Sequence, residues 1–173
     1  MASGRPADTE YAPFYAGYVS LVQEDDALAA LERQLDELRA LSVSIPKDRE
    51  TYRYAPDKWS VRQVVGHVTD GERVFGYRAF CISRGEQAPL PSFDENAYVA
   101  RSSYDSVPLG ELVDELVAVR RTNLAALRRL TAAEWRGLGT ASGKPVSVRA
   151  LAYVMAGHPR HHIGVLREKY GVA

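Results

Sequence analysis

The stretch Gly157-His158-Pro159-Arg160-His161-His162-Ile163-Gly164 holds three of the four histidines in the chain. His158 and His162 are four residues apart, so on a helix they point the same way, one turn apart. Two neutral imidazoles at this spacing commonly offer a pair of ligands to a divalent metal ion. The stretch therefore predicts a helix that carries part of a metal site.

The residues on either side of this stretch predict where the helix begins and ends. It is expected to start after Ser147 and to stop at Gly171, a residue type that favours the position after a helix. At about 100° per residue, His158 and His162 fall near the centre of the apolar stripe, and His161 falls towards its edge. We therefore expect the first two to face the core, with His161 at the edge of the site or on the surface.

Two other features of the same helix affect this prediction. Pro159 cannot donate a hydrogen bond to the carbonyl of Met155 and can bend the helix beside a proposed ligand. Ala156 and Ile163 fall off the apolar stripe, so they are candidates for a second buried face, such as a dimer contact.

Three earlier segments also have apolar residues at helical spacing. The first segment follows Asp25 and Asp26, and Gln34 is among the polar residues expected on its outer face. The second segment opens with the capping box of Ser60 and Gln63 and ends near residues 84–85. The third segment begins near Pro108. Their expected buried stripes are Leu28, Leu31, Leu35 and Leu38; Val61, Val64, Val65, Val68, Phe75 and Ala79; and Leu109, Leu112, Val113, Leu116, Val119, Leu127 and Leu130.

The fourth histidine, His67, lies beside the apolar stripe of the second segment. Gly71 follows one turn later, where a small residue leaves room for a ligand or a neighbouring helix. Asn123 falls within the stripe of the third segment, where a buried amide needs partners. It is expected to bond either a ligand or histidine, or a nearby structural group.

Four long amphipathic helices without a convincing strand pattern predict an all-α fold, a four-helix bundle. Residues 85–107 form a long crossover loop with a short turn near residues 95–100, and residues 137–145 form a loop with a small hairpin. The crossover is either a binding loop or lid, or a plain connection between two helices that run the same way. We divide the chain into an N-terminal arm, residues 1–20, and a single bundle domain, residues 21–173, with the first ten residues expected to be mobile.

Composition limits the classes of partner. The 173 residues carry 22 basic and 22 acidic side chains, which argues against nucleic acid and a polybasic membrane contact. One cysteine excludes an internal disulfide, no apolar run approaches the length of a membrane helix, and the first ten residues lack the apolar core of a signal peptide. We therefore expect a cytoplasmic protein with no nucleic-acid or membrane partner.

Three motifs of the chain belong together: Lys58-Trp59-Ser60-Val61-Arg62-Gln63-Val64-Val65-Gly66-His67-Val68, Glu72-Arg73-Val74-Phe75-Gly76-Tyr77-Arg78 and Gly157-His158-Pro159-Arg160-His161-His162. They resemble the DinB-like family of metal-dependent four-helix bundle proteins over roughly residues 25–170. The resemblance implies a divalent metal held by His67, His158 and His162, frequent homodimers, and in some relatives thiol S-transferase or isomerase activity with a low-molecular-weight thiol. Pro159 departs from the acidic residue common in relatives, and Val165 departs from a common glutamine.

Three histidine ligands leave at least one open position on the ion, as in catalytic sites. Zinc, nickel and iron all suit imidazole ligands. The hypothesis is a metal-dependent thiol S-transferase or hydrolase of a small-molecule substrate; the alternative is a non-catalytic metal-binding stress protein that serves as a dimerisation module. Glu72 and Tyr77 are candidates for assisting the reaction at the metal; alternatively, they are packing or surface residues. Cys81, about 21 Å from His67 along one helix, is expected to be a buried small side chain rather than a ligand.

Overall fold

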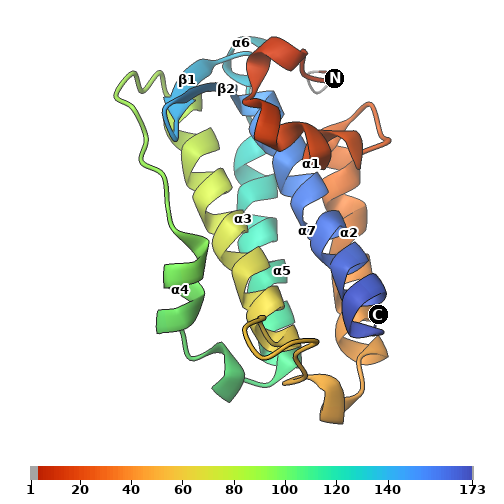
Figure 1. Cartoon of the computed structure of the whole chain (residues 1–173). Coiled ribbons are helices and arrows are strands. Elements are labelled where there is room, and N and C mark those ends of the chain that lie inside the picture. The colour runs from red at the N-terminus through yellow and green to blue at the C-terminus, as the bar shows by residue number, and fades with distance from the viewer. Residues whose placement is uncertain (1–3, 173) are drawn as a thin grey trace.

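Four long helices form the body of the molecule in the computed structural model, which describes residues 4–172 (Figure 1). The helix α3 packs against α5 and α7, and α2 packs against the same two helices from the opposite side. This arrangement confirms the predicted all-α four-helix bundle. The four helices are α2 (Ala27–Ser44), α3 (Val61–Ser83), α5 (Leu109–Leu127) and α7 (Val148–Tyr170).

The long crossover between α3 and α5 follows from the direction of the helices. These two helices run the same way, and α2 and α7 run the opposite way (Figure 1). The chain must therefore return along the whole bundle after α3. On this path it forms α4 (Glu95–Arg101) and the 3-10 turn η4 (Tyr104–Ser106), both packed beside α3.

The ends of the helices lie where local sequence signals place them. The hydroxyl of Ser60 accepts a hydrogen bond from the amide of Gln63, and the side chain of Gln63 accepts one from the amide of Ser60, which completes the predicted capping box. Ser147 caps α7, and Gly171 ends it with a left-handed φ of 65°. Pro108 is the residue before α5 rather than its first helical residue.

Short elements close one end of the bundle (Figure 1). The turn of helix α6 (Ala132–Trp135) leads into the antiparallel hairpin of β1 (Leu138–Ala141) and β2 (Lys144–Ser147). The amide of Leu90 in the crossover donates to the carbonyl of Thr140 at 2.8 Å. The crossover is thus fixed to the hairpin before it descends along α3.

The N-terminal segment forms η1 (Asp8–Glu10), which packs on β2, and η2 (Pro13–Tyr15) and α1 (Ala16–Ser20), of which α1 packs on α7. A further 3-10 turn, η3 (Lys47–Arg49), follows α2. Gly157 allows the close approach of α1, because a Cβ there would collide with the carbonyl oxygen of Tyr18. Arg5 donates to the carbonyls of Val19 and Val22, and Glu10 pairs with Arg149. The expectation of a mobile start is therefore wrong for residues 4–10, and residues 1–3 lie outside the described residues.

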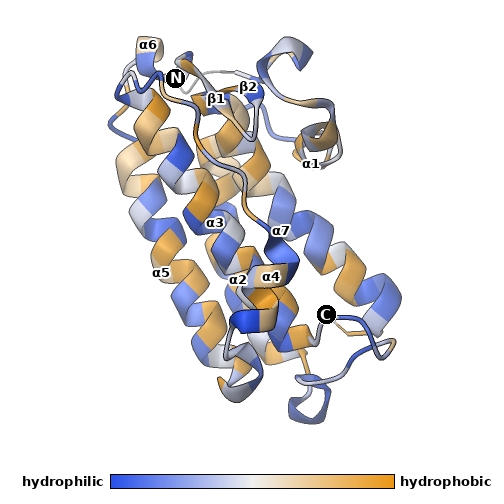
Figure 2. Cartoon of the chain, turned by 60° about the vertical axis from the view of Figure 1, so that its left-hand side comes forward, coloured by the Kyte–Doolittle hydropathy of each residue, from blue (hydrophilic) through white to orange (hydrophobic). Residues whose placement is uncertain are grey.

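The apolar faces of the helices turn inward (Figure 2). Burial corrects three predictions made from helical phase. Gln34 is 2% exposed rather than on the outer face, and Ala156 is fully buried within the chain rather than available for a dimer contact. In α5, Val117 is buried because this helix packs against both α2 and α3 and so buries a wider face, whereas Val119 is only half-buried.

No helix of the described residues is long and apolar enough to cross a membrane.

Candidate metal centre

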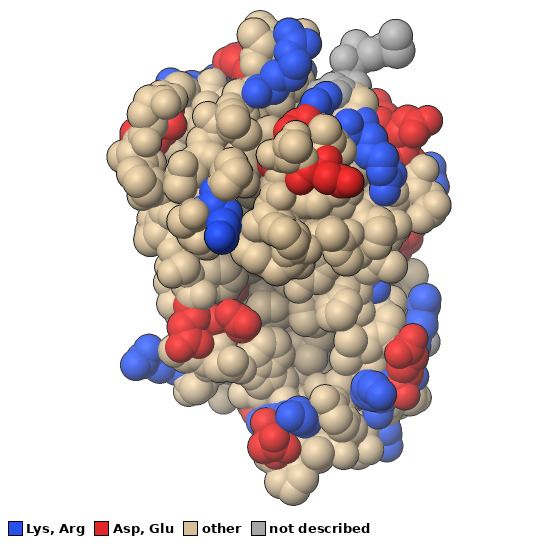
Figure 3. Space-filling model, turned by 45° about the horizontal axis from the view of Figure 1, so that its top comes forward, with Lys and Arg blue, Asp and Glu red and all other residues tan. Residues whose placement is uncertain are grey.

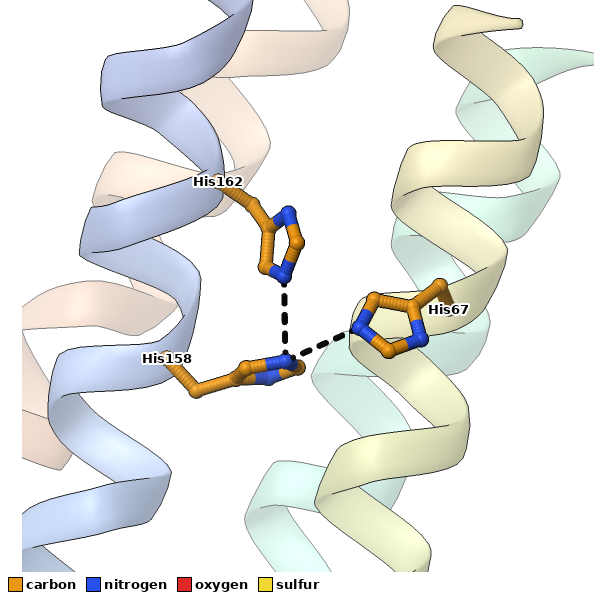
Figure 4. A group of neighbouring side chains, drawn as sticks. All are labelled: His67, His158 and His162. Carbon is orange, nitrogen blue, oxygen red and sulfur yellow. Dashed lines mark hydrogen bonds between the residues drawn. The ribbon is translucent and has the colours of Figure 1, made fainter. Parts of the chain in front are cut away.

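Three histidines from two helices meet in the bundle (Figure 4). His67 comes from α3, and His158 and His162 come from α7, one turn apart. The Nε2 atom of His158 lies 3.1 Å from Nε2 of His67 and 3.1 Å from Nε2 of His162. The possible ligand atoms of all three lie within 4.8 Å of one another. The structure thus brings the predicted residues together around one point.

The protonation of these rings suits a metal ion. Burial lowers the pKa of His67 to about 4 and that of His162 to about 3. Burial and the neighbouring imidazoles hold the pKa of His158 well below its usual value. All three rings are therefore neutral at pH 7, and a neutral imidazole can present a lone pair on Nε2. One proton on Nε2 of His158 can serve only one of its two neighbours, whereas a divalent ion would accept all three lone pairs.

Aromatic contacts hold the rings in place. The ring of Trp59 lies 4.7 Å from that of His67, centroid to centroid, and the rings of Tyr18 and Phe75 meet His158 edge-on. The buried Nδ1 of His67 has no hydrogen-bond partner among the described residues, so on that side of the ring packing rather than a hydrogen bond holds it. At Gly71 an added Cβ would come within 2.7 Å of His158 Cε1. The space left by this glycine therefore holds a ring from the neighbouring helix.

A cavity of about 350 Å³ opens beside the three histidines. A hollow with mainly uncharged surroundings is visible on this side of the molecule (Figure 3). Arg78, Glu95 and Ser142 are its polar lining residues besides the histidines and two tyrosines. A cavity of this size and lining suits a small molecule with an apolar body. Its aromatic wall is formed by Phe14, Tyr15, Tyr18, Trp59, Phe75 and Phe93.

Comparison with known proteins places the fold in a family. The family model of the DinB superfamily matches residues 30–166. The chain belongs to the DinB superfamily. No curated protein shows significant sequence similarity to it.

Solved structures share the DinB superfamily fold at low sequence identity. YfiT from Bacillus subtilis, described as a probable metal-dependent hydrolase with an unusual four-helix bundle topology, has a TM-score of 0.71 and 17% identity, covering 99% of this chain and 95% of its own. The DinB-like protein YjoA from Bacillus subtilis has a TM-score of 0.58 and 21% identity, covering 84% and 89%. The mycothiol-dependent maleylpyruvate isomerase has a TM-score of 0.64 and 13% identity, covering 91% of this chain and 64% of its own.

Other residues that the sequence suggested lie away from the cavity of this DinB superfamily protein. The carboxylate of Glu72 pairs with Arg120 at 2.8 Å, and Asn123 donates to its carboxylate and its carbonyl, so both side chains are structural. Tyr77 is 56% exposed and does not line the cavity. Cys81 is half-buried rather than buried.

His161 lies at the edge of the site. It is exposed, and its ring packs edge-on against Tyr18 at 5.4 Å. The helical phase therefore separated it correctly from His158 and His162.

Sequence reasoning missed two charged residues of the cavity. Arg78 follows His67 by eleven residues on α3, a spacing that returns to nearly the same face after three turns, so its phase could have revealed it. Glu95 begins the short helix α4 in the crossover, where no periodic pattern points to the site.

Proposed function

We propose that this DinB superfamily protein is a divalent-metal-dependent enzyme that acts on a small molecule bound in the aromatic cavity. The observation that carries the proposal is the convergence of three neutral Nε2 atoms beside that cavity. Among the described residues, no cysteine or carboxylate joins the three histidines within reach of one ion. Closed structural sites use four protein ligands, whereas three ligands leave a position for a reacting group.

His67, His158 and His162 would hold the metal. A metal bound in such a site lowers the pKa of a bound water or thiol and so supplies a nucleophile at neutral pH. The aromatic wall would position the substrate and limit the access of water. Hydrolysis is the reaction we favour, in line with the description of YfiT.

Thiol S-transfer is the second candidate reaction. It is supported by the shared fold of a mycothiol-dependent isomerase, and it would need a low-molecular-weight thiol as a second cofactor. The two reactions differ in a measurable way, because only thiol transfer depends on added thiol.

The test begins with metal-depleted protein reloaded separately with zinc, nickel or iron. Each form is assayed on a panel of small esters and amides, and on electrophiles with and without glutathione or mycothiol. We expect metal-dependent turnover that is lost in His162→Ala and kept in His161→Ala. If the protein binds metal stoichiometrically but converts nothing in either panel, the alternative of a non-catalytic metal-binding stress protein is favoured. If it binds no metal, the proposed site is wrong.

Homodimer formation is part of the proposal and is tested separately by light scattering on the purified protein. The buried position of Ala156 removes one residue that the sequence offered for such a contact.

A further inference from the structure

Among the described residues, two arginines are almost completely buried, and their surroundings differ. Arg120 is fully buried, and both of its partners on Glu72 are carboxylate oxygens at 2.8 Å. Arg78 is 2% exposed, and no carboxylate of the described residues forms an ion pair with it. The charge of Arg120 is thus neutralised within the fold, whereas that of Arg78 is not.

The guanidinium of Arg78 is held in place by three neutral oxygens. Its Nη1 donates to the hydroxyl of Tyr15 at 3.1 Å, and its Nη2 donates to the carbonyl of Pro91 at 2.6 Å and the hydroxyl of Ser142 at 3.0 Å. These acceptors come from the N-terminal segment, the crossover and the hairpin turn. They fix the orientation of the group but do not neutralise its charge.

Donor capacity remains on this side chain. A guanidinium has five N–H groups. The three hydrogen bonds of Arg78 leave the N–H of Nε and one N–H of Nη1 without a partner among the described residues. A buried charge is costly unless it is paired and hydrogen-bonded. Arg78 therefore has both the charge and the donors to bind an anion.

Arg78 lines two cavities, one of about 300 Å³ between α3 and the crossover and the one beside the three histidines, and we place the anion in the second because only that cavity also holds the histidine cluster. Arg78 lines the same cavity as His67, His158 and His162. Arginine keeps its charge at all physiological pH values and recognises carboxylates through directed hydrogen bonds.

The rest of the lining limits the charge and shape of the ligand. Glu95, which is exposed, is the acidic residue of this lining, and it would repel a doubly charged group more than a singly charged one. The aromatic wall fits an apolar body.

We propose that Arg78 is the anion-recognition residue of the cavity and that the substrate is a small monocarboxylate with an apolar or aromatic body. This inference rests on the proposed function, because it names the class of molecule that enters the same cavity. Arg78 would bind the carboxylate, and the histidine cluster would face the part of the substrate that reacts.

The test uses simple probes and protein without metal, so that no probe can bind through the ion. Binding of phenylacetate, phenylacetamide and phenyl phosphate to the metal-depleted chain is measured by isothermal titration calorimetry. We expect phenylacetate to bind at least tenfold more tightly than the other two. This preference should disappear in Arg78→Met, persist in part in Arg78→Lys, and be unchanged in the matched control Arg84→Met, which changes an exposed arginine next to α3.

Several outcomes would overturn the inference. It is wrong if phenylacetate and phenylacetamide bind equally, if neither binds, or if folded Arg78→Met keeps the preference for phenylacetate. It is also wrong if phenyl phosphate binds more tightly than phenylacetate, because the anion recognised would then be a phosphoryl group. If Arg78→Met does not fold, the acid–amide comparison on the wild-type protein and on Arg78→Lys decides. If the protein prefers the carboxylate but shows no metal-dependent turnover, this inference stands and the proposed function fails. If it shows metal-dependent turnover but no carboxylate preference, the proposed function stands and this inference fails.

Discussion

Arg120 donates from Nη2 to the carbonyl oxygen of Met155 at 2.9 Å, and this is the carbonyl that Pro159 leaves without its helical donor. The helix α7 continues through the proline from Val148 to Tyr170. A side chain of α5 thus supplies the missing bond one turn from His158. Gln34 supports the same region, since it accepts from Arg120 and donates to the carbonyl of Ala156, each at 2.6 Å.

This relationship predicts a coupling between Arg120 and Pro159. In Pro159→Ala the new amide can donate to Met155, so losing Arg120 no longer leaves that carbonyl unpaired. We expect Arg120→Met to cost about 1 kcal/mol less in free energy of unfolding in the Pro159→Ala background than in the wild type. Urea unfolding of the four proteins measures the coupling, and the distant change Gly164→Ala should combine additively with Arg120→Met. Additive effects of Arg120 and Pro159 would show that the hydrogen bond contributes nothing.

Metal binding should stabilise the folded protein only when the three histidines are intact. Zinc at about 100 times its dissociation constant is expected to add about 2.7 kcal/mol to the free energy of unfolding. The variants His67→Gln and His162→Gln should lose most of this gain, because two ligands bind an ion more weakly than three. The matched control His161→Gln, which changes the exposed neighbour, should keep it. Thermal unfolding with zinc, nickel or a chelator measures the effect, and an equal loss in all three variants would contradict the assignment.

Gly71 should be required for the position of His158. A methyl group there would approach Cε1 of His158 to 2.7 Å, so Gly71→Ala must displace the ring. We expect at least a tenfold loss of zinc affinity, measured by competition with a chromogenic chelator. The control is Gly164→Ala on α7, where nothing lies within 4 Å of the added methyl group. This variant should keep its zinc affinity and gain up to about 1 kcal/mol in stability, as alanine favours a helix over glycine. Unchanged affinity in folded Gly71→Ala would show that the ring of His158 does not need this space.

The parts of the fold that could be predicted from the sequence depend on residues close together in the chain. The capping box of Ser60 and Gln63, the cap at Ser147 and the end at Gly171 each act within a few positions, so α3 and α7 were bounded correctly. Gln34 was misplaced because its partner, the carbonyl of Ala156, lies 122 positions away. In the local sequence pattern of a helix, a polar side chain that is buried against a partner far away in the chain looks the same as a polar side chain exposed to solvent.

The same distinction applies to the candidate site. Helical phase placed His158 and His162 on one inward face, and resemblance to a family added His67. The wall of the cavity could not be predicted in this way, because Phe14 and Phe93 come from the N-terminal segment and the crossover, which have no regular period. Their position depends on how these segments pack on the finished bundle.

The pair of Glu24 and Arg160 predicts part of the acid sensitivity of the fold. Arg160, next to Pro159 on α7, donates from Nη1 and Nη2 to the two carboxylate oxygens of Glu24 at 2.8 and 2.7 Å. These hydrogen bonds lower the pKa of Glu24 to about 2 from its usual 4.5. Because the folded state holds the carboxylate more strongly than the unfolded state, the stabilisation is complete above pH 4.5 and is lost as the pH falls towards 2.

We therefore expect Glu24→Gln to lower the free energy of unfolding by about 1–2 kcal/mol at pH 7, an amount reduced for partial exposure of the pair to solvent. The difference from the wild type should shrink between pH 4.5 and pH 2, because protonation removes the same charge from the wild-type protein. Glu168→Gln, an exposed change on α7, should leave the pH profile unchanged. Urea unfolding from pH 2.5 to pH 7 measures all three proteins, and a difference between Glu24→Gln and the wild type that is constant across this range would show that the charge of Glu24 does not stabilise the fold.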